Sequence, residues 1–218
     1  MTSAPSPGNG QSQPASGPLL QLLASALQLW VRQQCEAVGS LEIELLGSSL
    51  QLLRGRLDGV RVLARQVTYR NLDLEQVELT SSPLELRLSS LWRGQPLQLR
   101  QEFRIRGRVG VTPAGLQRSL VRPAWRPLAD RLSDQLLGIT PLVSLRIDAD
   151  RLVFTARPIS GGDPLERHTT LQVEAGGLRI TPEEGSPALL PIDPSIQLER
   201  VNLEEGLLIL RGSAAITP

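Results

Sequence analysis

Three groups of side chains have residue types that could perform catalysis. Asp148 and Asp150 lie two residues apart, so on one strand their carboxylates would share a face and could transfer protons or bind a cation. An Asp-x-Asp pair beside a turn is more typical of a solvated hairpin. His168 is the only histidine, and it has no spaced Cys, Asp or Glu partners for a metal site or a triad. Ser48-Ser49 lacks the Gly-x-Ser-x-Gly pattern of a nucleophile elbow.

The glycines form neither a phosphate-binding loop nor a dinucleotide fingerprint. Gly55 and Gly59 are interpreted as turn residues. We therefore expect that the protein is not an enzyme and that it binds no metal and no cofactor.

The composition favours phosphate recognition by arginine. All 23 basic residues are arginine, whose guanidinium grips phosphate with two parallel hydrogen bonds. A GC-rich coding bias would produce the same composition without a functional role. Segment 100–131 holds eight arginines against two acidic residues, a surplus of six charges in a chain of net charge +1. The candidate contacts with a phospholipid headgroup or an anionic membrane surface are Arg104, Arg106, Arg108, Arg118, Arg122, Arg126 and Trp92.

Residues 97–111 alternate between apolar odd positions and mostly charged even positions. This period predicts one strand with an apolar face and an arginine-lined face. At about 3.3 Å per residue the strand would be roughly 50 Å long, which suggests a large curved sheet with a concave apolar surface. The candidate lining of an apolar groove is Leu97, Leu99, Phe103, Ile105 and Val109.

The overall composition excludes several classes of protein. Aromatic residues make up only 3% of the 218 residues, which disfavours a stacking platform for single-stranded nucleic acid. The net charge of +1 argues against a general polyanion binder. Cys35 is the only cysteine, so an internal disulfide is impossible, and the free thiol fits a reducing compartment.

The N-terminal region shows neither a convincing signal peptide nor a transmembrane helix. The apolar run Leu19–Val31 is too short to span a bilayer, and no basic residue precedes Arg32. We expect a cytoplasmic protein, with peripheral attachment to a membrane as a further option. Residues 1–18 are rich in Pro, Gly, Ser and Gln and predict a disordered tail, followed by a single lipid-binding-like domain over 19–218.

Sequence signals indicate where several predicted helices and strands begin and end. Residues 19–38 predict a helix that is apolar nearly all round, with Trp30 in the core and Gly39 as the stop. Residues 41–111, including 50–57, predict a meander of antiparallel strands with a bulge near Glu75-Gln76. Thr112-Pro113 predicts a helix start.

Proline interrupts the region that follows. Leucines recur every four residues up to Leu136, but Pro123 and Pro127 predict two short helices or one kinked helix ending at Gly138. Residues 157–168 predict a loop. Strands are predicted at 143–147, 152–156, 169–175, 178–180, 196–203 and 207–211.

The order of these elements and four short segments resemble the LmeA-like phospholipid-binding family of cyanobacteria and actinobacteria. The segments are Gly55–Gly59 before Val60-Arg-Val62, "YRNL" at 69–72, Pro83-Leu-Glu-Leu, and "VTPAGL" at 111–116. The resemblance covers residues 19–215. It implies an α+β fold similar to tubular lipid-binding (TULIP-like) domains, in which a strongly curved antiparallel sheet wraps a long N-terminal helix. It also implies lipid binding without catalysis.

The favoured hypothesis is therefore a phospholipid-binding protein that holds acyl chains in an apolar groove, with arginines at the rim for the headgroup. The alternative is a protein-interaction or assembly module at a membrane surface that recruits a partner through strand edges. Balanced charge and scarce aromatics disfavour nucleic acid as a partner.

Overall fold

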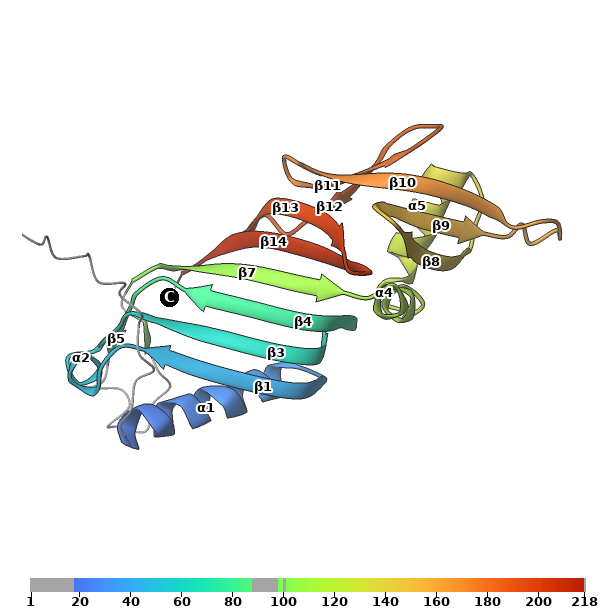
Figure 1. The fold of residues 1–218 in the computed structure, drawn as a ribbon. Coiled ribbons are helices and arrows are strands. Elements are labelled where there is room, and N and C mark those ends of the chain that lie inside the picture. The colour runs from blue at the N-terminus through green and yellow to red at the C-terminus, as the bar shows by residue number, and fades with distance from the viewer. Residues whose placement is uncertain (1–17, 88–97, 100, 218) are drawn as a thin grey trace, which may run out of the picture.

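The computed structural model describes residues 18–87, 98–99 and 101–217 (Figure 1). Within these residues the fold is mixed α+β and consists mostly of antiparallel strands. The predicted class is therefore confirmed. The predicted tail lies outside the described residues apart from Pro18, which begins the first helix. That residues 19–218 form one lipid-binding-like domain stays a prediction, as does the wrapping of the helix by a strongly curved sheet.

The largest sheet has six antiparallel strands in the order β1-β3-β4-β7-β14-β13. Successive strands of the predicted meander pair as neighbours, and the C-terminal hairpin then closes against β7. The strands are β1 Ala37–Leu46, β3 Gly59–Tyr69, β4 Leu72–Ser81, β7 Phe103–Val111, β13 Ile196–Glu204 and β14 Leu207–Ile216.

Helix α1 (Pro18–Gln34) lies against one face of this sheet, along β1 (Figure 1). Leu41, Ala64 and Val67 are buried beneath its C-terminal half, where Val31 and Cys35 contact them. Leu74 and Val77 join the same cluster although their positions differ in parity, so the parity change near Glu75-Gln76 is present. The predicted bulge is wrong, because β4 pairs with β3 in the same register on both sides of this point. The parity also changes in β3, where Ala64 and Val67 share the cluster and Gln66 has a φ of 53°.

A small three-stranded sheet packs against the N-terminal half of α1. It comprises β2 (Arg56–Leu57), β5 (Leu84–Arg87) and β6 (Gln98–Leu99), beside the short helix α2 (Ser49–Leu53). Leu52 of α2 is buried with Leu20 of α1. This cluster fixes the N-terminal half of α1 to the sheet.

A second sheet of five strands, in the order β12-β11-β10-β9-β8, forms a separate layer. Helix α5 (Arg126–Leu137) covers one face of it, and the buried core there includes Leu132, Leu136 and Phe154. The strands are β8 Leu142–Asp148, β9 Arg151–Ala156, β10 Leu165–Glu174, β11 Gly177–Pro182 and β12 Ala188–Pro191.

Helix α4 (Pro113–Leu120) connects the two layers. Thr112 caps it by accepting a hydrogen bond from Gly115 N at 3.0 Å, and Pro113 occupies its first turn. These features confirm the predicted helix start. Residues 121–125 then separate α4 from α5, which ends at Gly138 with a φ of 71°. The prolines thus produce two helices.

The structure corrects the predicted continuous strand over 97–111. Gln98 and Leu99 belong to β6, whose Leu99 pairs with Leu86, whereas β7 begins only at Phe103. A bend at Gln101 separates the two strands. Leu86 is a buried member of the α1–α2 cluster, so pairing with β5 draws the first part of the predicted strand away from the large sheet.

Four other predictions about local structure are wrong. Residues 49–53 form a helix because Ser48 and Gln51 make a reciprocal capping box. Helix α1 ends at Gln34, and Gly39 lies inside β1, where a Cβ would approach Gln66 Oε1 at 2.8 Å. Trp30 is exposed, not buried. Strand β10 begins at Leu165, inside the predicted loop.

Candidate lipid-binding site

The odd-numbered residues of β7 share one face of the six-stranded sheet with apolar residues of the neighbouring strands. Val109 pairs with Val77 of β4 on one side and with Leu210 of β14 on the other. Directly paired residues in an antiparallel sheet project from the same face. The same face therefore continues from β7 to Leu210, and from Leu210 to Val201 of β13.

Part of this apolar face lies outside the clusters that α1 covers. The α1 clusters take up its β1 and β3 side, but six half-buried side chains farther along belong to none of the three packed clusters within the described residues. We call these six residues the apolar strip. It spans β4, β7, β14 and β13, a width of about 14 Å at the usual strand spacing. The strip consists of Leu79, Ile105, Val109, Leu198, Val201 and Leu210.

Two glycines lie side by side in the middle of the apolar strip. Gly107 of β7 pairs with Gly212 of β14. The side chain of Leu79 covers Gly107, because a Cβ there would lie 2.8 Å from Leu79 Cδ2. The backbone of β13 covers Gly212, because a Cβ there would lie 2.5 Å from Gln197 O. The glycines therefore allow Leu79 and β13 to pack closely on this face.

A polar pocket borders the apolar strip where β13 meets the second sheet. Its volume is about 290 Å³, and Val201 and Leu203 line it together with Leu171 of β10. Asp150, Asn202 and Glu204 supply its polar wall. The carboxylates make this pocket unsuited to a phosphate, so the apolar strip is the better candidate for contact with a lipid.

The predicted arginines of β7 lie on the opposite face of the sheet. Arg106 pairs with Thr80 and Ser213, and its neighbours two positions away, Arg104 and Arg108, share its face. Arg108 forms an ion pair with Glu78 at 3.4 Å. Since β7 is an interior strand, these arginines project from the middle of the polar face. They do not border the apolar strip.

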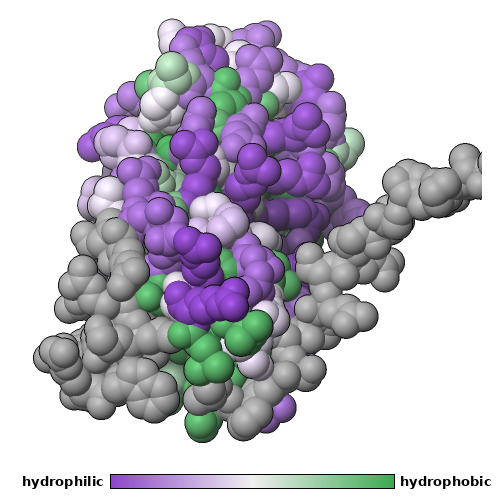
Figure 2. Space-filling model, turned by 90° about the vertical axis from the view of Figure 1, so that its left-hand side faces the viewer, coloured by the Kyte–Doolittle hydropathy of each residue, from purple (hydrophilic) through white to green (hydrophobic). Residues whose placement is uncertain are grey.

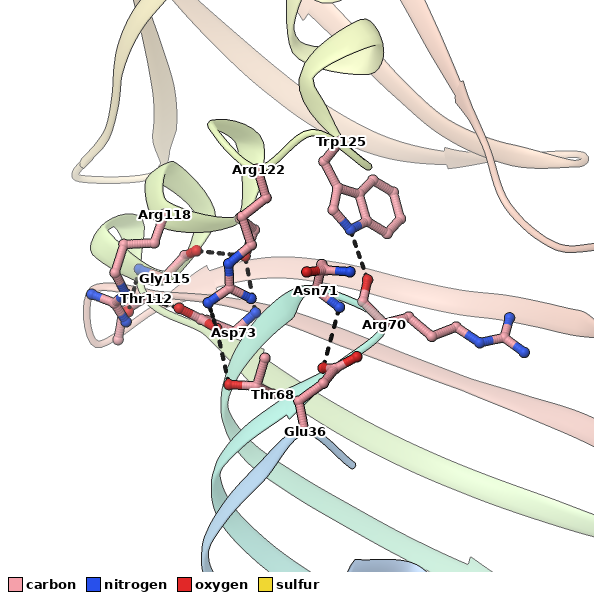
Figure 3. A network of polar contacts seen from close by, with 11 residues as sticks. Glu36, Thr68, Arg70, Asn71, Asp73, Thr112, Gly115, Arg118, Arg122 and Trp125 are labelled. Carbon is pink, nitrogen blue, oxygen red and sulfur yellow. Dashed lines mark hydrogen bonds and ion pairs between the residues drawn. The ribbon is translucent and has the colours of Figure 1, made fainter. Parts of the chain in front are cut away.

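Arg118 and Arg122 come together on one carboxylate, that of Asp73 at the start of β4 (Figure 3). Arg118 Nε donates to Asp73 Oδ2 at 2.8 Å, and Arg122 Nη2 lies 2.9 Å from Oδ1. Thr68 Oγ1 donates to the same carboxylate at 3.1 Å. Desolvation alone would raise the pKa of Asp73, but the hydrogen bonds from Arg118 and Thr68 and the charge of Arg122 outweigh it, so the pKa is lowered.

The backbone of the β3–β4 hairpin docks onto the same helical segment. Arg70 and Asn71 have φ values of 48° and 63°, and the Arg70 carbonyl accepts a hydrogen bond from Trp125 Nε1 at 2.9 Å. Asp73 N donates to Ser119 Oγ, and a Cβ on Gly115 would lie 2.9 Å from Asp73 O. The β3–β4 hairpin, which holds "YRNL" and Asp73, therefore meets the helical segment that begins with "VTPAGL" in a joint between the large sheet and α4 (Figure 3).

A comparison with protein families identifies the chain. The model of the LmeA-like phospholipid-binding family matches residues 15–213. The chain belongs to this family. No curated protein and no solved structure matches it. In this LmeA-like protein, no helix of the described segments is both long enough and apolar enough to cross a membrane.

The other predicted site residues of this LmeA-like protein are dispersed. Phe103 packs against the α1–α2 cluster, whereas Ile105 and Val109 belong to the apolar strip. Arg126 forms an ion pair with Asp130 at 3.3 Å. Leu97 and Trp92 lie outside the described residues, as does the side chain of Leu99.

The residues with possible catalytic chemistry have other roles in the structure. Asp148 at the end of β8 pairs with Arg146 at 3.1 Å, and Asp150 lies in the hairpin turn that follows. Ser48 caps α2. His168 lies within β10, opposite Val153. Among the residues that the structure describes, no three His, Cys, Asp or Glu side chains gather as a metal site would require.

Sequence reasoning missed four of the six residues of the apolar strip. Leu79, Leu198, Val201 and Leu210 lie far apart in the chain and resemble ordinary core residues. Only the pairing of β4 and β14 with β7 places Leu79 opposite Gly107 and Leu210 opposite Val109. The apolar run at 207–211 was visible, but a single sequence does not specify which strand it would join.

Proposed function

We propose that this LmeA-like protein binds phospholipid without converting it, with the acyl chains lying on the apolar strip. The observation that carries the proposal is the half-buried apolar surface over β4, β7, β14 and β13. Large half-buried side chains that belong to no packed cluster leave apolar area available to a ligand. The family supports the lipid class of that ligand.

The physical basis of binding is removal of hydrocarbon from water. Burying each methylene of an acyl chain contributes about 0.8 kcal/mol. An acyl chain would lie across the aliphatic side chains of the strip, among them Ile105 and Val109 of β7. No group with perturbed acid–base chemistry lies in the strip, which consists of aliphatic side chains. A binding role without catalysis follows.

The proposed role of the β7 arginines is attraction of an anionic membrane surface, because they lie on the opposite face of the sheet from the apolar strip. Arg104 and Arg106 are exposed on the polar face, across the sheet from the apolar strip. They would attract an anionic membrane surface, at about 1 kcal/mol for each basic residue near the leaflet. Arg118, Arg122 and Arg126 have acidic partners within the fold, which weakens the support for a headgroup role. Trp92 remains a proposed bilayer contact.

The first experiment is native purification followed by organic extraction and mass spectrometry. The wild-type protein should carry phospholipid, whereas Val109→Glu should carry little because it places a charge in the apolar strip. Val143→Glu is the matched control, since Val143 is exposed on β8 of the second sheet. If the wild-type protein is free of lipid and instead retains one protein partner, the alternative of an interaction module is favoured.

That alternative rests on a specific feature of the fold. Strand β1 is a ten-residue edge of the large sheet, and an unpaired edge can accept a strand from a partner. A proline at Glu42, which lies in β1, would weaken such pairing and leave the apolar strip untouched. Loss of a partner in this variant, without any change in lipid content, would support the interaction module.

A further inference from the structure

The outer face of α1 carries large apolar side chains that the fold leaves exposed. Leu22, Leu29 and Trp30 are each between 58% and 68% exposed. Leu22 and Leu29 lie seven residues apart, which places them on one side of the helix, and Ala26 lies between them. The opposite side of the helix is the one that packs on the sheet, through Leu20, Leu23 and Leu27.

Helix α2 adds exposed leucines beside the N-terminal half of α1. Leu50 and Leu53 are exposed by 59% and 55%, while Leu52 between them is buried against α1 residues. Two helices that share one buried cluster therefore both present leucines to solvent. We call Leu22, Leu29, Trp30, Leu50 and Leu53 the helical apolar surface.

The two helical segments themselves carry only positive charge, while carboxylates lie beside them at Asp58, which accepts a hydrogen bond from Gln51 of α2, and at Glu85. Residues 18–35 and 47–57 contain three arginines and no acidic residue. Arg54 and Arg56 are exposed beside α2, where Arg56 also pairs with Glu85 at 3.4 Å. Figure 2 views this end of the molecule and shows hydrophobic surface in its lower part below a mostly hydrophilic upper part.

We propose that the helical apolar surface docks onto an anionic phospholipid bilayer, with α1 and α2 lying in the headgroup region. Exposed leucines beside a tryptophan, on helices whose only charged residues are arginines, have the chemistry of an interfacial helix. A bilayer accepts apolar side chains on a broad convex surface, and its anionic headgroups match Arg54 and Arg56. The inference deepens the proposed function, on which it rests, because it names the surface through which the protein reaches its lipid.

This surface is distinct from the apolar strip and from the arginines of β7. It lies on the side of α1 that faces away from the sheet, so occupation of the strip by a lipid leaves it accessible. Other exposed apolar residues, such as Val143, Ile159 and Leu189, are dispersed over the second sheet and its loops. They supply matched controls with the same loss of apolar side chain at a different place.

The test measures binding to vesicles of phosphatidylcholine and phosphatidylglycerol in equal parts by flotation. The wild-type protein is compared with Leu22→Gln/Leu29→Gln and with Leu50→Gln/Leu53→Gln. Each double variant should bind at least about tenfold more weakly, because two leucine side chains no longer leave water. The control Val143→Gln/Leu189→Gln should bind like the wild type. Thermal unfolding by circular dichroism verifies that each variant is folded.

The outcomes separate this proposal from the function on which it rests. Unchanged vesicle binding in folded helix variants overturns the docking surface, as does a wild-type protein that binds no vesicles. A wild-type dimer that both helix variants convert to a monomer, without vesicle binding, assigns the surface to a second copy and also overturns it. Phospholipid extracted from the same preparations tests the apolar strip, since docking variants should lose vesicle binding and retain extractable lipid.

Discussion

The joint around Asp73 predicts a measurable loss of stability when one carboxylate is neutralised. Asp73→Asn preserves the shape of the side chain but removes the charge that holds Arg118 and Arg122. The Asp73 side chain is only 13% exposed and that of Arg122 29%, so solvent screens this pair less than a surface pair. Arg122 Nη1 is already buried without a hydrogen-bond partner among the described residues.

The expected cost follows from those contacts. Removing one partner of a partly buried, charge-assisted network leaves the other charge uncompensated, and we expect a loss of about 2–4 kcal/mol in the free energy of unfolding. Asp130→Asn is the matched control, because Asp130 also pairs with an arginine but is 41% exposed. Its cost should stay within about 0.5 kcal/mol. Urea unfolding followed by circular dichroism measures both values.

The pH dependence provides a second test of the same joint. The pKa of Asp73 is lowered from its ordinary value of 3.8, so its stabilising contribution is fully present above that value. It is lost as the pH falls below 3.8 through the pKa of the folded state. The difference in stability between wild type and Asp73→Asn should therefore shrink below this pH. A variant within about 0.5 kcal/mol of the wild type at neutral pH would refute the proposed role of the joint.

Three further predictions concern the apolar strip, the polar face and the second core. Leu210→Glu should purify with much less extractable phospholipid than the wild type, because it places a charge next to Val109. Reversing the charge of Arg104 and Arg106 should weaken vesicle binding only when the vesicles contain anionic lipid, and equal weakening with neutral vesicles would contradict an electrostatic role. Phe154→Ala should cost about 3–5 kcal/mol in urea unfolding, because this ring is 1% exposed within the α5 cluster.

Local signals explain which elements could be predicted from the sequence. Thr112 and Pro113 fix a helix start through one side-chain hydrogen bond and one fixed φ, both of which are local properties. The parity change near Glu75-Gln76 could be predicted because the apolar residues at 72 and 74 are even-numbered, whereas those at 77 and 79 are odd-numbered. Such signals require no knowledge of distant residues.

The errors arose where distant contacts override local pattern. Leu99 continues the alternation of β7 but pairs with Leu86, so the alternation extends across two sheets. Trp30 lies in a helix apolar on nearly every side, and a sequence alone does not specify which side meets the sheet. Ser48 and Gln51 did provide a local signal for α2, since their spacing is that of a capping box.

The contacts of two of the segments that resemble the family indicate which part of the fold these segments stabilise. Tyr69–Leu72 and Val111–Leu116 lie at the joint, where Trp125, Asp73 and Ser119 lock the hairpin to α4. These residues connect the two layers, and none of the six residues of the apolar strip is among them. The strip is built from leucine, isoleucine and valine, which exchange for one another at low cost in a half-buried position. If the strip binds lipid as proposed, its lipid preference could therefore change while the contacts of the joint stay the same.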